Sequence, residues 1–120
     1  MDIDNLKALL AKFAEDRDWD QFHSPKNLSM ALSVEVAELL EHFQWLSEAE
    51  SKELASEKSK EVSEEIADIQ IYLIRLADKL NIDIDDAVRT KLKINSAKYP
   101  AEKVRGSSKK YSDYLEVGKK

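Results

Sequence analysis

Residues 28–46 read LSMALSVEVAELLEHFQWL, and residues 61–80 read EVSEEIADIQIYLIRLADKL. In both stretches leucine and isoleucine recur at the three- and four-residue spacing of an amphipathic α-helix. The first apolar stripe consists of Leu28, Leu32, Leu39 and Leu46, and the second of Ile66, Ile69, Leu73, Leu76 and Leu80. Two long helices of this kind in a short chain predict an all-α fold that resembles a four-helix bundle.

Each of these two helices carries a pair of carboxylates three residues apart. The pairs are Glu35 with Glu38 and Glu65 with Asp68. Residues at this spacing lie about 60° apart around a helix, so each pair shares one face. Glu35 falls inside the leucine stripe, where a carboxylate without a partner is costly. Two facing pairs offer hard oxygen ligands, which indicates a site for Mg²⁺, or alternatively for Mn²⁺.

Other interpretations of these residues stay open at this point. The carboxylates could be surface residues that flank the stripes and pair with lysine or arginine, because exposed glutamates are common. A di-iron site is disfavoured, because it requires Glu-x-x-His on two helices and neither His23 nor His42 follows a glutamate by three residues. The alternative function is a non-enzymatic helical adaptor with an acidic interaction face.

The composition limits the class of protein. The 120 residues include only two glycines, two prolines and no cysteine, which is typical of one helical domain in the reducing cytoplasm. No apolar run reaches the roughly 18 residues of a membrane span, and the N-terminus has no signal-peptide pattern, so we expect no membrane association. The net charge of −5 is carried by an acidic body with a basic tail, and it predicts no nucleic-acid binding.

Local signals set the expected boundaries. We expect four main helices, at residues 4–16, 25–46, 58–80 and 83–97, and a short crossover helix at residues 48–56. Ser24 before Pro25 is a favoured helix start, and Ser47 with Glu50 three residues later is a capping-box pattern. We expect a loop at residues 17–23, a helical domain at residues 1–100 and an irregular basic tail at residues 101–120.

The helix expected at residues 58–80 is apolar on more than one face. Ile71 and Ile74 lie well away from the stripe that contains Leu73 and Leu76. A helix that is apolar on nearly all sides must be surrounded by other elements. Four short helices from one chain are too few to surround it, so the pattern predicts a homo-oligomer.

Three segments, in this order along the chain, resemble the MazG-like nucleoside triphosphate pyrophosphohydrolases, an all-α family. They are EVAELLEHFQW (35–45), EEIADIQIYL (64–73) and KLKINSAKYP (91–100). The loop RDWDQFHSPKNL (17–28) and the tail segment RGSSKKYSDY (105–114) further resemble the deoxycytidine triphosphate pyrophosphatase branch of that family.

The resemblance implies a Mg²⁺-dependent hydrolase that converts a nucleoside triphosphate, with dCTP favoured, to the monophosphate and pyrophosphate. It implies that Glu35, Glu38, Glu65 and Asp68 are the metal ligands and catalytic groups, with one of them, Glu61 or Glu64 accepting the proton. It also implies a homodimer or a homotetramer.

The resemblance further implies a set of substrate contacts. Those that line the nucleotide pocket would be Trp19, His23, Trp45, Tyr72 and Asn95, and those that contact phosphate would be Lys98, Arg105 and Lys109. From the residues alone, aromatic side chains at helix ends are more often core or interface residues. A lone loop histidine such as His23 is usually a polar surface or capping residue.

Overall fold

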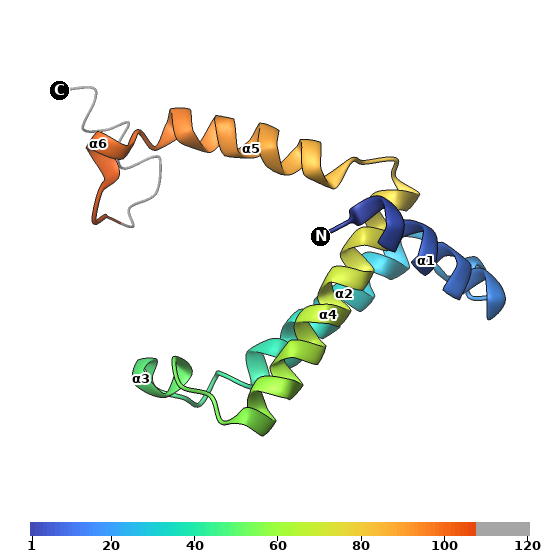
Figure 1. Cartoon of the computed structure of the whole chain (residues 1–120), viewed down its shortest axis with the longest axis horizontal. Coiled ribbons are helices and arrows are strands. Elements are labelled where there is room, and N and C mark those ends of the chain that lie inside the picture. Colours follow the sequence, from blue (N-terminus) through green and yellow to red (C-terminus); the bar gives the residue numbers. More distant parts are fainter. Residues whose placement is uncertain (108–120) are drawn as a thin grey trace. The chain divides into compact units, whose positions relative to one another are not determined.

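A computed structural model describes residues 1–107 of the chain, and every regular element in that part is a helix (Figure 1). The elements are α1 (Ile3–Asp16), the 3-10 helix η1 (Asp20–Phe22), α2 (Pro25–Glu41), α3 (Glu48–Ser51), α4 (Ser56–Lys79), α5 (Ile84–Lys98) and α6 (Ala101–Val104). The predicted all-α class is therefore confirmed. Within residues 1–107, no helix is both long enough and apolar enough to cross a membrane.

The chain divides into two compact units, Met1–Ile82 and Asp83–Lys120, which are described separately. The first unit holds the helices from α1 to α4, and the second begins at α5. The expected division into a helical domain at residues 1–100 and a tail at residues 101–120 stays a prediction. Residues 101–104, which were expected to be irregular, form the short helix α6 after Pro100.

The helix starts predicted at Ser24 and Ser47 are confirmed. The hydroxyl of Ser24 accepts a hydrogen bond from the backbone N–H of Asn27 at 3.1 Å, and Pro25 follows as the first residue of α2. Ser47 caps α3 in the same way, while the Glu50 carboxylate accepts a hydrogen bond from the Ser47 N–H at 2.9 Å. Both caps supply acceptors to backbone N–H groups that have no partner within the helix.

The expected end of α2 at Leu46 is wrong, because the helix ends at Glu41. The chain then follows turns in which the Phe43 N–H bonds the Leu40 carbonyl, and the Leu46 N–H bonds the Phe43 carbonyl. The capping box at Ser47 requires an extended backbone at that residue, so a continuous helix cannot pass through it. The crossover helix is also shorter than expected, ending at Ser51.

The first unit is built on the pairing of α2 with α4, and α1 packs against α4 (Figure 1). The buried apolar side chains of the described residues come from these three helices. They are Ala14, Leu28, Val62, Ile74 and Ala77. One charged side chain, Arg75, is buried together with them.

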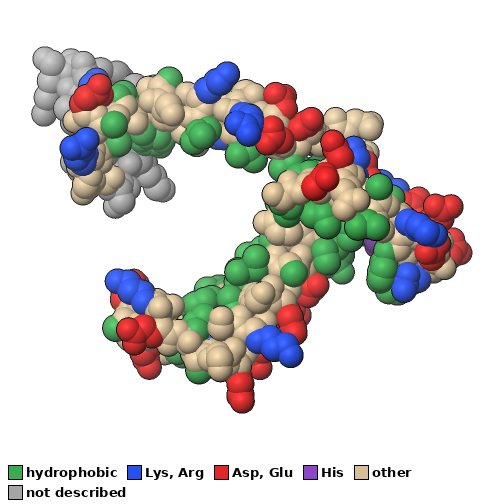
Figure 2. Space-filling view, viewed as in Figure 1, with side chains coloured by type: hydrophobic (Ala, Val, Ile, Leu, Met, Phe, Trp, Pro, Cys, Tyr) green, Lys and Arg blue, Asp and Glu red, His purple; other side chains and the backbone are tan. Residues whose placement is uncertain are grey.

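Part of the predicted apolar stripe of α4 is not covered by residues 1–107. Ile66 is 49% exposed, Leu73 is 36% exposed and Leu80 is 47% exposed. Figure 2 shows hydrophobic side chains along one side of the α2–α4 pair. The buried face of α4 instead includes Arg75, so this face is partly polar.

The cap of α2 gives a direct test of this fold. We expect Ser24→Ala to lower the free energy of unfolding by about 1 kcal/mol, because the Asn27 N–H loses its acceptor. Urea unfolding followed by circular dichroism measures the change. Ser33→Ala is the matched control, since the Ser33 hydroxyl only donates to the Met30 carbonyl of its own helix. Equal destabilisation by both substitutions would contradict a role for the cap.

Candidate metal centre

Three carboxylates meet where α2 packs against α4. Glu35 and Glu38 come from α2 and Glu65 from α4, and each contributes an oxygen that lies within 4.8 Å of the other two. The three-residue spacing on α2 turns both glutamates toward the neighbouring helix. The tertiary pairing of α2 with α4 then supplies the third carboxylate. Several carboxylate oxygens at one point form the ligand set that hard divalent cations prefer.

Two oxygens of this cluster are buried without a hydrogen-bond partner. They are Oε2 of Glu35 and Oε2 of Glu65. A buried carboxylate oxygen without a partner carries a large desolvation cost, and a bound cation would offset that cost. The oxygen-only donor set and the two unpartnered oxygens therefore fit a divalent cation of the Mg²⁺ type.

The electrostatics of the cluster also favour a cation. The pKa of Glu35 is raised to about 7 from an ordinary value of 4.5, mainly by burial and also by hydrogen bonds with Glu65 and Glu38 and by the charges of Glu38 and Asp68. Near neutral pH the cluster therefore retains a proton where its oxygens converge. A cation that binds there replaces this proton and neutralises the same repulsion.

Asp68 lies one turn beyond Glu65 and is half-buried. Its charge contributes to the raised pKa of Glu35, but its oxygens do not belong to the group that lies within 4.8 Å. The structure thus brings together three of the four predicted ligands and places the fourth beside them. The assignment of all four as ligands stays a prediction.

A basic pair borders the cluster, and sequence reasoning missed it. The Lys58 ammonium donates a hydrogen bond to Nδ1 of His42 at 3.1 Å. Because an ammonium can only donate, Nδ1 is unprotonated and the ring proton lies on Nε2, which is 4.0 Å from Oε1 of Glu65. His42 follows Glu38 by four residues on α2, and this spacing was the available signal. Glu61 also lies here, 3.7 Å from Nδ1 of His42, and its side chain is 58% exposed.

The predicted aromatic contacts lie at several places in the first unit. Trp19 packs edge-to-face on Phe13, with ring centroids 5.8 Å apart, and remains 46% exposed. His23 follows η1 and is half-buried, and Tyr72 on α4 is also half-buried. Trp45 lies in the turns after α2 and is 87% exposed. Trp45 is therefore largely uncovered by the described part of the chain.

The remaining predicted contacts belong to the second unit or lie beyond the described residues. Asn95 and Lys98 are half-buried residues of α5, and Arg105 is the exposed residue that ends α6. Lys109 lies outside the described residues. The roles of these four residues stay predictions.

The MazG-like family is matched over residues 30–114, which is most of the chain. The chain belongs to the MazG-like family. Among curated MazG-like relatives, dCTP pyrophosphatase 1 of Rattus norvegicus is 42% identical over 113 residues and that of Homo sapiens is 41% identical. Both matches cover 92% of this chain and 66% of the relative, so the chain spans about two thirds of their length.

A solved structure of a MazG-like relative supports the same fold. The crystal structure of a pyrophosphatase from Archaeoglobus fulgidus is 44% identical in sequence, with a TM-score of 0.78. The match covers 83% of this chain and 94% of that chain. The resemblance inferred from the three sequence segments is therefore confirmed.

Proposed function

We propose that this MazG-like chain is a divalent-cation-dependent nucleoside triphosphate pyrophosphohydrolase that converts dCTP to dCMP and pyrophosphate. The observation that carries the proposal is the convergence of Glu35, Glu38 and Glu65, with two buried oxygens that lack partners. The names of the similar proteins support the reaction, because the curated relatives are dCTP pyrophosphatases and the solved structure is a pyrophosphatase.

The side chains of the cluster have two proposed roles, which are to bind the cation and to accept a proton. Glu35, Glu38 and Glu65, with Asp68 beside them, would hold Mg²⁺. The bound cation supplies positive charge opposite the phosphate oxygens and acts as a Lewis acid. One carboxylate of this group, or Glu61 or Glu64 on α4, would accept the proton of the water that attacks the α-phosphorus.

The proposed substrate contacts rest on the family resemblance. We assign the nucleoside to Trp19, His23, Trp45, Tyr72 and Asn95, and the phosphates to Lys98, Arg105 and Lys109. Tyr72 follows Asp68 by four residues on α4, so its side chain lies one turn beyond the carboxylates on the same face. The basic residues offset the negative charge of the triphosphate, which the acidic first unit repels.

The exposed apolar side chains favour self-association. Leu40 is 59% exposed on α2 and Ile66 is 49% exposed on α4. Trp45 is 87% exposed, so within residues 1–107 it is a large aromatic side chain that is mostly uncovered. Large exposed apolar side chains favour contact with another molecule. We propose a homodimer or homotetramer, located in the cytoplasm, where a chain without cysteine loses nothing in a reducing environment.

A panel of nucleoside triphosphates tests the reaction. With Mg²⁺ we expect dCTP to be consumed fastest, and chromatography should resolve dCMP and pyrophosphate as the products. A nucleoside diphosphate with orthophosphate would contradict the proposed bond cleavage. Activity confined to purine triphosphates would contradict the proposed base preference. A protein silent on every nucleotide would favour the adaptor with an acidic interaction face.

A further inference from the structure

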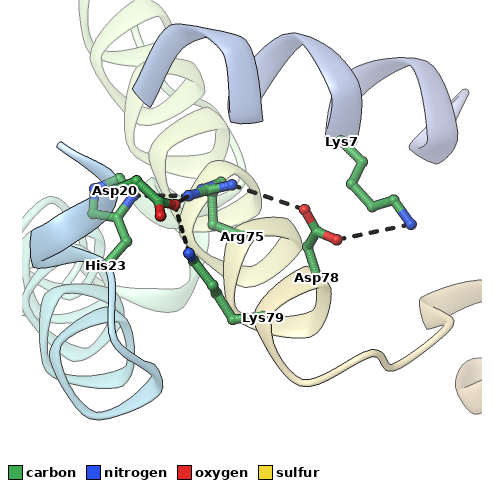
Figure 3. Close-up of polar contacts among 6 residues, drawn as sticks. All are labelled: Lys7, Asp20, His23, Arg75, Asp78 and Lys79. Carbon is green, nitrogen blue, oxygen red and sulfur yellow. Dashed lines mark hydrogen bonds and ion pairs between the residues drawn. The ribbon is translucent and has the colours of Figure 1, made fainter. Parts of the chain in front are cut away.

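Arg75 is the only charged side chain that is buried among residues 1–107, with 4% of its surface exposed. A buried guanidinium is costly unless it is paired, and replacement by an apolar side chain is often tolerated or even stabilising. Two acidic residues and a histidine surround it in Figure 3, and they come from two separate parts of the chain. Arg75 therefore carries a desolvation cost, and its contacts extend beyond its own helix.

The contacts of Arg75 tie the loop after α1 to α4 (Figure 3). Nη2 of Arg75 donates to Oδ1 of Asp20 at 3.0 Å and to Nδ1 of His23 at 3.3 Å. Nη1 lies 3.8 Å from Oδ2 of Asp78, which belongs to the same helix. The Lys79 ammonium donates to the same oxygen of Asp20.

The segment that these contacts hold has few regular bonds of its own. The 3-10 helix η1 spans three residues, and single turns of this kind are held by few hydrogen bonds. Trp19 rests on Phe13, and the Asn27 amide donates to the Phe22 carbonyl at 3.0 Å. Arg75 and Lys79 link this segment to α4 across more than 50 residues of sequence, and Arg75 is the one of the two that also contacts His23.

The same contacts fix the chemical state of His23. An arginine side chain can only donate, so Nδ1 of His23 accepts and the ring proton lies on Nε2. Burial lowers the pKa of His23, and the positive charges of Arg75 and Lys79 lower it further, against a raising effect of Asp20. At neutral pH His23 therefore presents an uncharged Nε2–H donor, not an imidazolium.

The position of Arg75 along α4 relates this loop to the carboxylates. Glu65, Asp68, Tyr72 and Arg75 follow one another at spacings of three, four and three residues, which places them along one face of α4. Seven residues separate Asp68 from Arg75, a rise of about 10 Å along the helix. This separation is comparable with the distance from the phosphates of a nucleotide to its base.

We propose that Arg75 is a positioning residue that holds Trp19 and His23 at the nucleoside end of the site, with His23 fixed as a neutral Nε2–H donor. The inference rests on the proposed triphosphate hydrolysis and adds to it a residue that sets substrate affinity. Arg75 does not touch the reacting atoms, because its guanidinium is engaged by Asp20, His23 and Asp78. Its loss should therefore weaken nucleotide binding and leave the chemical step intact.

The first experiment compares Arg75→Met with Arg89→Met by steady-state kinetics on dCTP. Methionine keeps an unbranched side chain about as long as the stem of arginine up to Nε, and it removes every donor. We expect Arg75→Met to raise KM about tenfold with kcat within about twofold of wild type, the effect of losing a hydrogen bond to a charged group. Arg89 pairs with Asp85 at 2.8 Å on exposed α5 surface, so its substitution is the matched control and should leave both constants unchanged.

A second variant keeps the test informative if the buried substitution prevents folding. The side chain of Asp20 is 59% exposed, so Asp20→Asn should fold, and it weakens the bond to Arg75 from the loop side. We expect a KM about threefold higher than wild type, because the amide oxygen still accepts a weaker hydrogen bond. A fall in kcat at constant KM in Arg75→Met or Asp20→Asn would overturn the positioning role, as would equal effects of Arg89→Met.

The second experiment reads the state of His23 directly by ¹⁵N NMR of the imidazole nitrogens. The chain has two histidines, so His42→Gln assigns both sets of signals. We expect wild-type His23 to be neutral with an unprotonated Nδ1 at pH 7. In Arg75→Met the pKa of His23 should rise towards its ordinary value of 6.5, because the positive charge beside it is lost. In Asp20→Asn, which serves where Arg75→Met does not fold, the raising effect of the Asp20 charge is lost, so the expected change is a mixture of the two tautomers. Unchanged His23 signals in these variants would overturn the proposed positioning role of Arg75. A wild-type protein that is inactive on every triphosphate would instead overturn the proposed function.

Discussion

Glu35→Gln and Asp68→Asn are each expected to lower kcat for dCTP hydrolysis by about a hundred- to a thousandfold. The loss of one group that stabilises developing charge in a buried site costs about a hundred- to a thousandfold. Glu35 combines an unpartnered buried oxygen with a raised pKa, so it is the ligand whose loss should matter most. Asp68 acts on the same centre through its charge.

Both substitutions preserve the shape of the side chain and remove one negative charge. Glu41→Gln is the matched control, because Glu41 is an exposed glutamate that ends the same helix α2. Steady-state kinetics at saturating Mg²⁺ and dCTP should show the large loss in kcat only at positions 35 and 68. A Glu35→Gln enzyme with more than a tenth of the wild-type kcat would exclude Glu35 as a catalytic ligand.

The helical spacing of carboxylates on α2 and α4 was sufficient to predict most of the cluster. An i, i+3 pair shares a face whatever surrounds it, and the leucine stripe indicates which face turns inward. Glu35, Glu38 and Glu65 therefore come together as the spacing indicates. Asp68 stands beside this group because the crossing of two helices, which no local pattern encodes, decides which oxygens converge.

The Arg75 network could not be predicted from local patterns. Asp20 and His23 lie 55 and 52 residues from Arg75, and their contact depends on the packing of the loop against α4. From the sequence, Arg75 reads as a polar residue beside an apolar stripe. The apolar stripe of α4 predicted a buried face, but Ile66, Leu73 and Leu80 are 36–49% exposed within residues 1–107. An apolar stripe predicts that a helix face is buried, but it does not specify whether the same chain or another molecule buries it.

The end of α2 illustrates a competition between local signals. The leucine pattern continues to Leu46, whereas the capping box at Ser47 demands an extended residue immediately after it. The capping signal prevails because it satisfies two backbone N–H groups at once, and the last residues then relax into turns. Trp45 lies in those turns and is exposed for that reason.

Mg²⁺ is expected to raise the melting temperature, and the gain should be larger at pH 8 than at pH 5.5. The folded pKa of Glu35, about 7, lies above its ordinary value of 4.5. Between these two values the folded chain binds more protons than the unfolded chain, so without metal the free energy of unfolding falls as the pH rises. The stabilisation by the proton is complete below pH 4.5 and is lost through about pH 7.

Mg²⁺ competes with this proton, and for that reason the gain in melting temperature should be larger at pH 8 than at pH 5.5. At pH 5.5 the cation must displace the proton, whereas at pH 8 it meets an ionised cluster whose repulsion it relieves. At a free concentration a hundredfold above Kd, the cation adds about 2.7 kcal/mol to the free energy of unfolding.

Glu35→Gln separates this site from an ordinary surface ion pair. The amide removes one charge from a repelling group, so in EDTA at pH 8 the variant should melt at a higher temperature than wild type, with a flatter dependence on pH. It should also gain little from Mg²⁺, whereas Glu41→Gln should behave like wild type. Thermal melts of the three proteins at both pH values, with EDTA and with millimolar Mg²⁺, measure these differences. A wild-type melting temperature that ignores Mg²⁺ at pH 8 would show that the carboxylates do not bind the ion in the absence of nucleotide.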